Sequence, residues 1–333
     1  MPAVQPQQLV DAILDAIAQS GENALLVSSI RTHPRKFAIS GSLGPLHLWV
    51  YAWTLTPGGR PQLKNEYRIQ MTSVSSPLLL NPDGPTVLIG YEPNLNMFAG
   101  FDIELHTTFT SGSPSVQVNI ESIRKALQNG LAFGRKENRE ITVAIRPDHL
   151  MTYVRNAQNL HSKAKRNSTL ALLEKACSLS PIADEEILLQ DIERRRLIQT
   201  VSRISRSANF REQVLNAYGN RCAITRMQLR LVEAAHILPV PAPGSVDHVR
   251  NGVALSPTYH RAFDSGLIYL RPDYEVRLNP AKEAQLRKLG LTAGLAEFRR
   301  SLGRIHLPAD KGQWPEPIFI KRANKYRGIP VNT

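Results

Sequence analysis

The chain has 333 residues, of which 42% are hydrophobic, and this is enough for two domains with cores of ordinary size. No apolar run approaches the length of a membrane span, and the two cysteines allow at most one disulfide and exclude a four-cysteine zinc site. The net charge of +13 is uneven, because residues 1–190 carry 17 basic against 16 acidic side chains, whereas residues 191–333 carry 24 against 12. The second part of the chain is therefore expected to attract polyanions.

The N-terminal part predicts a mainly β domain. Residues 1–21 have the pattern of an amphipathic helix, without the basic prelude and small-residue cleavage site of a secretion signal, so we expect a cytoplasmic location. From 37 to 145, short β-prone runs alternate with Gly, Pro, Asn and Asp, and one helix interrupts them at 120–128. Residues 46–54 are apolar on both faces, as in a central strand. The expected domain is a twisted sheet or a partly closed barrel with flanking helices.

Two groups of side chains on predicted strands can be assigned either to the fold or to binding. Trp49, Tyr51 and Trp53 share one face of their strand, where they either belong to the core or stack on an extruded base. A polar group on the next strand either contacts base edges or simply faces solvent, and its members are Asn65, Tyr67, Arg68 and Gln70.

The middle of the chain predicts helices and a domain boundary. A helix over 147–165 ends in the basic, polar run 162–168, which we interpret as the boundary. A second helical region covers 183–205, and its three consecutive arginines either touch phosphate or are solvated: Arg194, Arg195 and Arg196. Asn209 and Glu212 have the spacing of a reciprocal cap for a separate helix over 210–218.

The stretch from 231 to 264 contains the most specific pattern. His236 precedes Asn251 by 15 positions, Asn251 precedes His260 by nine, and His260 precedes Asp264 by four. A short strand over 232–238 ends at a proline, a Pro- and Gly-rich loop follows, and residues 251–255 return as a second strand. Ser256-Pro257 then predicts a helix start, with His260 and Asp264 one turn apart on one face.

This pattern resembles the HNH nuclease motif, or ββα-metal finger, in the branch of predicted restriction endonucleases with the strand EAAHI and the helix YHRAFD followed by GLI. The resemblance covers roughly residues 209–270. It implies that His236 is the general base that deprotonates water and that Asn251 holds the loop and orients the base. It also implies that His260 and Asp264 bind a divalent cation beside the scissile phosphate.

One position departs from the family pattern. Many relatives have a metal-binding Asp or His directly before the general base, whereas this chain has Ala235. Glu233 shares the face of Ala235 on an alternating strand, so it is the candidate third ligand, directly or through water. The residue types suit phosphodiester hydrolysis, since a neutral histidine takes a proton from water and a hard cation stabilises the charge on the leaving group.

We therefore expect an α+β protein with a DNA-recognition domain at 1–165, a helical basic linker at 166–207 and a ββα-metal HNH nuclease domain at 208–333. The expected function is restriction-type cleavage of double-stranded DNA at a specific, methylated or otherwise modified site, with Mg²⁺, Mn²⁺ or another divalent metal. One nuclease domain per chain suggests a homodimer, because a duplex has two strands to cut. The alternatives are a less selective defence or mobile-element nuclease and a DNA-binding regulator with an inactive HNH fold, the latter motivated by Ala235.

Overall fold

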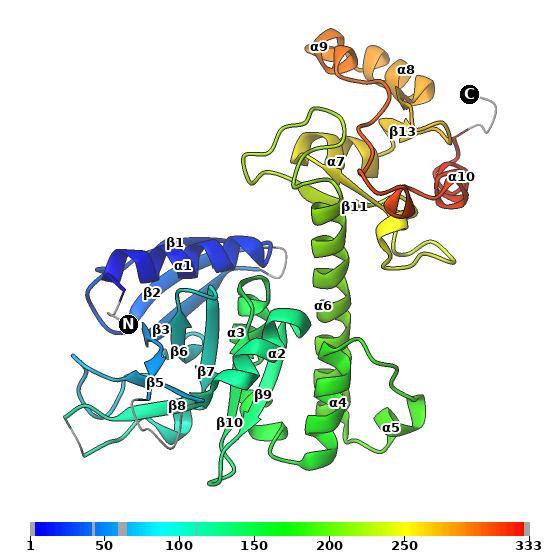
Figure 1. Ribbon diagram of the computed structural model, residues 1–333. Coiled ribbons are helices and arrows are strands. Elements are labelled where there is room, and N and C mark those ends of the chain that lie inside the picture. The colour runs from blue at the N-terminus through cyan, green and yellow to red at the C-terminus, as the bar shows by residue number, and fades with distance from the viewer. Residues whose placement is uncertain (1–3, 42–43, 59–64, 111, 330–333) are drawn as a thin grey trace. The chain divides into compact units, whose positions relative to one another are not determined.

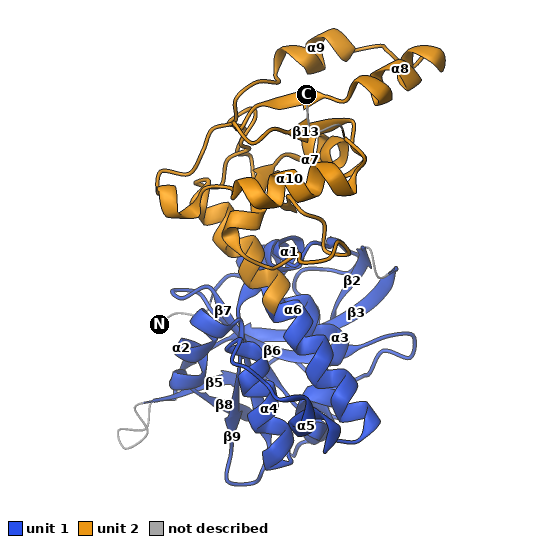
Figure 2. Cartoon of the chain, turned by 90° about the vertical axis from the view of Figure 1, so that its right-hand side faces the viewer, with its two compact units in different colours: residues 1–205 blue, residues 206–333 orange. Residues whose placement is uncertain are grey.

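The computed structural model describes residues 4–41, 44–58, 65–110 and 112–329, and the chain divides into two compact units, residues 1–205 and 206–333 (Figure 2). The start of the predicted N-terminal helix, residues 1–3, and the end of the predicted nuclease domain, residues 330–333, lie outside the described residues. Within the described part, no helix is both long enough and apolar enough to cross a membrane.

Unit 1 is built on an open seven-stranded sheet (Figure 1). In spatial order its strands are β1 (Asn23–Leu26), β2 (Arg35–Ser40), β3 (Leu46–Thr54), β6 (Thr86–Glu92), β7 (Met97–Phe101), β10 (Ile141–Ile145) and β9 (Leu131–Arg135). Neighbours are antiparallel except β3 and β6, which run parallel. Of the two predicted forms, the sheet is confirmed, because among the described strands β1 and β9 stand at opposite edges and do not pair to close a barrel.

Both faces of this sheet are covered. Helices α1 (Pro6–Gln19) and α3 (Leu150–Lys163) pack on one face, where Val50 of β3 lies in the core. The other face carries α2 and a three-stranded sheet, with Tyr51 of β3 in its core. These elements are α2 (Ile120–Asn129), β4 (Thr56–Pro57), β5 (Glu66–Gln70) and β8 (Ser115–Asn119). This part of unit 1 also contains two 3₁₀ turns, η1 (Ile103–Leu105) and η2 (Pro147–His149). The prediction that 46–54 is a central strand, apolar on both faces, is confirmed.

Three helices follow, α4 (Asn167–Cys177), α5 (Asp184–Leu188) and α6 (Ile192–Ala217). Residues of α4 and of the first part of α6 join the core of unit 1, and α6 then continues into unit 2. The predicted cap at Asn209 is wrong, because α6 runs through this position without interruption. No glycine or proline occurs between Ile192 and Ala217, so nothing in the backbone ends the helix there.

Unit 2 consists of small elements around one core. Its elements after α6 are β11 (Glu233–His236), η3 (Val249–Asn251), β12 (Gly252–Leu255), α7 (Pro257–Asp264), β13 (Ile268–Leu270), β14 (Val276–Leu278), α8 (Pro280–Lys288), α9 (Leu295–Arg300), η4 (Lys311–Gln313) and α10 (Pro317–Tyr326). The last turns of α6 supply Phe210 and Val214 to this core, and Ile320 of α10 joins it. Cys222 is buried in the same core as a free thiol.

Candidate active site

The strand–loop–strand–helix arrangement predicted for 231–264 is present. Strands β11 and β12 form an antiparallel hairpin in which Glu233 lies opposite Leu255 and His236 opposite Gly252. Helix α7 follows directly, with Ser256 as the N-cap and Pro257 at the first helical position. The chain therefore places its candidate base at the end of a strand and its candidate metal ligands on a helix that packs against the same hairpin.

His236 is held from two sides. Its ring stacks on Phe210 of α6, with the ring centroids 3.8 Å apart and the planes 12° from parallel. Its Nε2 lies 2.9 Å from Oδ1 of Asp247, a residue of the loop between the two strands. Because a carboxylate only accepts hydrogen bonds, Nε2 carries the proton and Nδ1 remains as the basic nitrogen.

A glycine opposite His236 permits this packing. A Cβ on Gly252 would lie 2.2 Å from Cγ2 of Val214 and 3.1 Å from Cε2 of Phe210, closer than non-bonded carbon atoms approach. Helix α6 can therefore press against the hairpin at the level of His236 only while residue 252 lacks a side chain.

Asn251 is fully buried and holds the loop. Its Oδ1 accepts a hydrogen bond from the amide of Leu238 at 2.9 Å, and its Nδ2 donates to the carbonyl of Val246 at 3.0 Å. These contacts join the beginning of the loop to its end, immediately before Asp247. Among the described residues no hydrogen bond joins the Asn251 side chain to His236, and its amide group bonds to the loop instead.

The acidic side chains near His260 contact different nitrogens of its ring. Nδ1 lies 2.6 Å from Oε2 of Glu233, and Nε2 lies 3.3 Å from Oδ2 of Asp264. A histidine that ligates a metal is neutral, and in that state the shorter contact makes Nδ1 the donor and leaves Nε2, beside Asp264, to bind the ion.

These residues fit a cation in type, although they do not form a closed cage. Within the described parts of the chain, no three His, Cys, Asp or Glu side chains converge on one point. The 3.3 Å between Nε2 of His260 and Oδ2 of Asp264 does match two ligands of one ion, since metal–ligand distances of about 2.1 Å place neighbouring ligands about 3 Å apart. An ion bound here would have its remaining positions open for water and phosphate oxygen.

Sequence reasoning missed three residues at this site. Asp247 and Phe210 contact His236 as described, and neither belongs to the spacing pattern. Arg327, at the end of α10, lies over the ring of Phe263 at 4.4 Å and donates from Nη1 to the carbonyl of Ile237 at 3.0 Å. Burial lowers the pKa of the Arg327 guanidinium, and the carboxylate of Asp264 opposes that shift. Arg327 thus fixes the backbone directly after His236.

The other predicted binding residues lie in unit 1 and in α6. Tyr51 is buried, with its hydroxyl within 2.9 Å of the amide of Leu79. Trp49 and Trp53 are half-buried on the same face of β3. Lys36 Nζ lies over the Trp49 ring at 4.3 Å, and the ring of His33 stacks on Trp53 at 4.3 Å.

The polar candidates are more exposed. Gln70 and Asn65 are exposed and Arg68 is half-buried on β5. On α6, Arg194 pairs with Asp191, Arg195 donates to a backbone carbonyl, and Arg196 is exposed. No contact among the described residues joins these arginines to the strand candidates.

Comparisons with known proteins match both parts of the chain. Residues 46–154 match the family model described as methylase-associated X1, and residues 222–271 match the model described as HNH endonuclease. A comparison with curated proteins gives no match. Among solved structures, a modification-dependent TagI restriction endonuclease is 13% identical and is matched over 85% of this chain and 81% of its own, but a TM-score of 0.28 supports no conclusion from that likeness. The chain therefore combines a methylase-associated X1 domain with an HNH endonuclease domain, and the β11–β12–α7 site lies within the latter.

Proposed function

We propose that the protein is a restriction-type endonuclease that hydrolyses phosphodiester bonds of double-stranded DNA with a divalent metal, and that unit 1 selects a specific or modified site. The observation that carries the proposal is the fixation of His236 between Phe210 and Asp247, at the end of β11 in the HNH endonuclease domain.

His236 is the general base in this proposal. Asp247 accepts a hydrogen bond from Nε2–H of His236 and so directs the lone pair of Nδ1 toward a water molecule. Proton transfer to Nδ1 generates the hydroxide that attacks phosphorus, and the bond from phosphorus to the leaving sugar oxygen breaks. Asp247 then stabilises the imidazolium that results, as a carboxylate does for the histidine of a catalytic triad.

His260 and Asp264 are the proposed metal ligands, and Mg²⁺ or Mn²⁺ is the expected ion. Such an ion supplies Lewis-acid stabilisation of the phosphate and of the leaving oxygen. Glu233 accepts a hydrogen bond from Nδ1–H of His260 and holds Nε2 in the orientation that ligation requires. Two protein ligands are enough for an ion that takes its other ligands from water and phosphate.

DNA is the proposed partner because of the uneven charge as well as the nuclease domain. Residues 191–333 carry 24 basic against 12 acidic side chains, and such an excess binds phosphate backbones without regard to sequence. Site selection then falls to unit 1, with the β3 and β5 side chains and the α6 arginines as contact candidates. We also propose that two chains act together as a homodimer on the duplex.

Nicking of supercoiled plasmid with added magnesium or manganese tests the proposal. His236→Ala should abolish nicking and leave DNA affinity nearly unchanged, because the change removes a proton acceptor and few phosphate contacts. His306→Ala, which removes an exposed histidine of the same unit, is the matched control and should nick normally. DNA binding without nicking by the wild-type protein under every metal would instead identify a regulator with an inactive HNH fold.

A further inference from the structure

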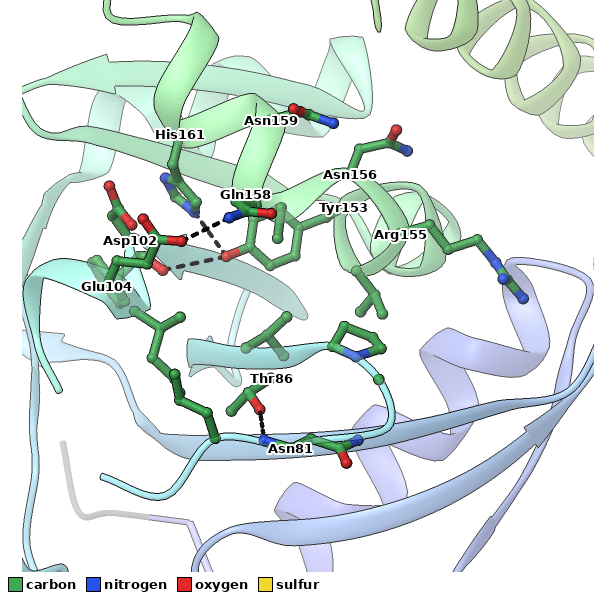
Figure 3. A pocket seen from close by; sticks show the side chains of 18 residues that line it. Asn81, Thr86, Asp102, Glu104, Tyr153, Arg155, Asn156, Gln158, Asn159 and His161 are labelled. Atoms are coloured by element: carbon green, nitrogen blue, oxygen red, sulfur yellow. Dashed lines mark hydrogen bonds between the residues drawn. The ribbon is translucent and has the colours of Figure 1, made fainter. Parts of the chain in front are cut away.

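Unit 1 contains a cavity of about 300 Å³ between helix α3 and the adjoining ends of β6 and β7 (Figure 3). Its volume lies in the lower part of the range for small-molecule sites. Many of its lining side chains are polar, and they include Asn81, Thr86, Asp102, Glu104, Asn156 and Gln158. The cavity therefore suits a small ligand with several hydrogen-bonding groups.

A buried pair at one wall has its protons assigned by its partners. His161 Nδ1 lies 2.7 Å from the carbonyl of Ile141 and so donates to it, which leaves Nε2 to accept the hydroxyl of Tyr153 at 2.9 Å. Burial lowers the pKa of His161 and raises that of Tyr153, so that both side chains are neutral. The Tyr153 hydroxyl proton is already engaged, and this pair offers no donor to a ligand.

Asp102 differs from its neighbours in having acceptor capacity to spare. Its side chain is 8% exposed, and across the described residues Lys165 Nζ is its ion-pair partner, at 3.4 Å. Charge-assisted hydrogen bonds are usually about 2.7–2.9 Å long, so this contact leaves the carboxylate weakly satisfied. By contrast, Glu104 on the same wall accepts a hydrogen bond from Gln158 at 2.8 Å. A buried carboxylate in this state favours a ligand that brings N–H donors.

We propose that this cavity receives a nucleobase extruded from the duplex, and that Asp102 selects a base with an exocyclic amine, cytosine or adenine. The inference rests on the proposed function, since it takes DNA as the substrate. A carboxylate accepts from the N4 amine of cytosine, whereas uracil and thymine present a carbonyl oxygen at that position and repel it. Arg166 is exposed just after the end of α3, where its charge can bind a phosphate next to the extruded nucleotide.

The test measures binding of the full chain to labelled duplexes, without metal, so that no cutting occurs. Each duplex carries one cytosine, uracil, 5-methylcytosine or thymine opposite an abasic site, where extrusion costs only unstacking. The cytosine duplex should bind about 10- to 100-fold more tightly than the uracil duplex, and 5-methylcytosine should exceed thymine by a similar factor, as expected for one hydrogen bond to a charged group. Cytosine and uracil both lack the 5-methyl group, and 5-methylcytosine and thymine both carry it. The comparison within each pair therefore measures the effect of the exocyclic amine alone.

Two variants and one control complete the experiment. Asp102→Asn should abolish both preferences, and Ala157→Phe, which fills the cavity from α3, should do the same with Asp102 intact. Glu121→Gln, the control, removes an equal charge from the exposed face of α2 and should retain both base preferences. Thermal melting identifies any variant that fails to fold.

No difference between cytosine and uracil in the wild-type protein overturns the proposal, and so does a preference that survives in folded Ala157→Phe or Asp102→Asn. Plasmid nicking reports separately on the proposed function. Nicking without a base preference refutes the cavity assignment alone. If the wild-type protein fails both to bind DNA and to nick plasmid, the proposed DNA endonuclease function itself is refuted.

Discussion

Replacement of Asp247 by Asn is the most direct test of how the candidate base is held. The amide keeps the size of the side chain and can still accept from Nε2 of His236, but it removes the negative charge 2.9 Å from that nitrogen. A hydrogen bond to a charged group contributes about 1.5–3 kcal/mol. The Asp247 side chain is 36% exposed, so solvent screening reduces the expected effect to about 1–2 kcal/mol.

That free energy corresponds to a cleavage rate about 5- to 30-fold lower than that of the wild-type protein. The rate is measured in a single-turnover assay, with the protein in excess over the DNA. DNA affinity should not change, because Asp247 stabilises the imidazolium and contacts no phosphate in this mechanism. Asp273→Asn, an equal change of charge in an exposed turn of the same unit, serves as the control and should cleave normally. A wild-type rate for Asp247→Asn would refute this role.

Three further predictions concern the metal site, the packing and the response to acid. His260→Ala should lose nicking, and raising the magnesium or manganese concentration should restore part of it; equal rescue of His236→Ala would mean that the two roles are exchanged. Gly252→Ala should lower the free energy of unfolding by about 1–3 kcal/mol in denaturant titration, because the added methyl group overlaps α6; an unchanged midpoint would contradict the close packing. Burial alone would raise the pKa of Glu140, but hydrogen bonds from His106 and Lys136 lower this pKa from 4.5 to about 2. Ionised Glu140 therefore stabilises the folded state fully above pH 4.5, and this contribution is lost as the pH falls toward 2. Glu140→Gln should therefore destabilise the protein by about 3 kcal/mol at neutral pH and by progressively less in that acid range, as followed by thermal melts; a constant difference across this range would contradict the cause assigned.

The sequence predicted the elements of the candidate site better than their neighbours. The hairpin and helix over 231–264 were predictable because Pro239, the loop glycine and Ser256-Pro257 mark boundaries that the local backbone obeys. The continuity of α6 through Asn209 was not predictable, since the cap signal at this residue favours a separate helix, whereas the uninterrupted helical backbone and the buried side chains on both sides of it prevail.

Contacts made by loop and distant residues could not be predicted. Asp247 contacts His236 from a loop, where the spacing of residues carries no periodic signal. Arg327 donates to the carbonyl of Ile237, which lies 90 positions earlier in the chain. The same limit applies to Tyr51. The alternation of residues along β3 places it on the same face as Trp49 and Trp53, but does not show that its hydroxyl forms hydrogen bonds with the backbone of Leu79. Pattern identifies faces and turns, whereas these pairs depend on tertiary packing.

The clamp made by Asn251 has a consequence for the chain between its two ends. Since its amide group joins Leu238 to Val246, the stretch 239–244 is closed at both ends. Ala242 within it is buried in the core of unit 2, whereas Val240 and Pro241 are exposed. Doubling the length of a flexible loop costs only about 0.6 kcal/mol in closure entropy. An insertion at 240–241, such as a peptide tag or a segment that touches DNA, should therefore leave the candidate base His236 in place.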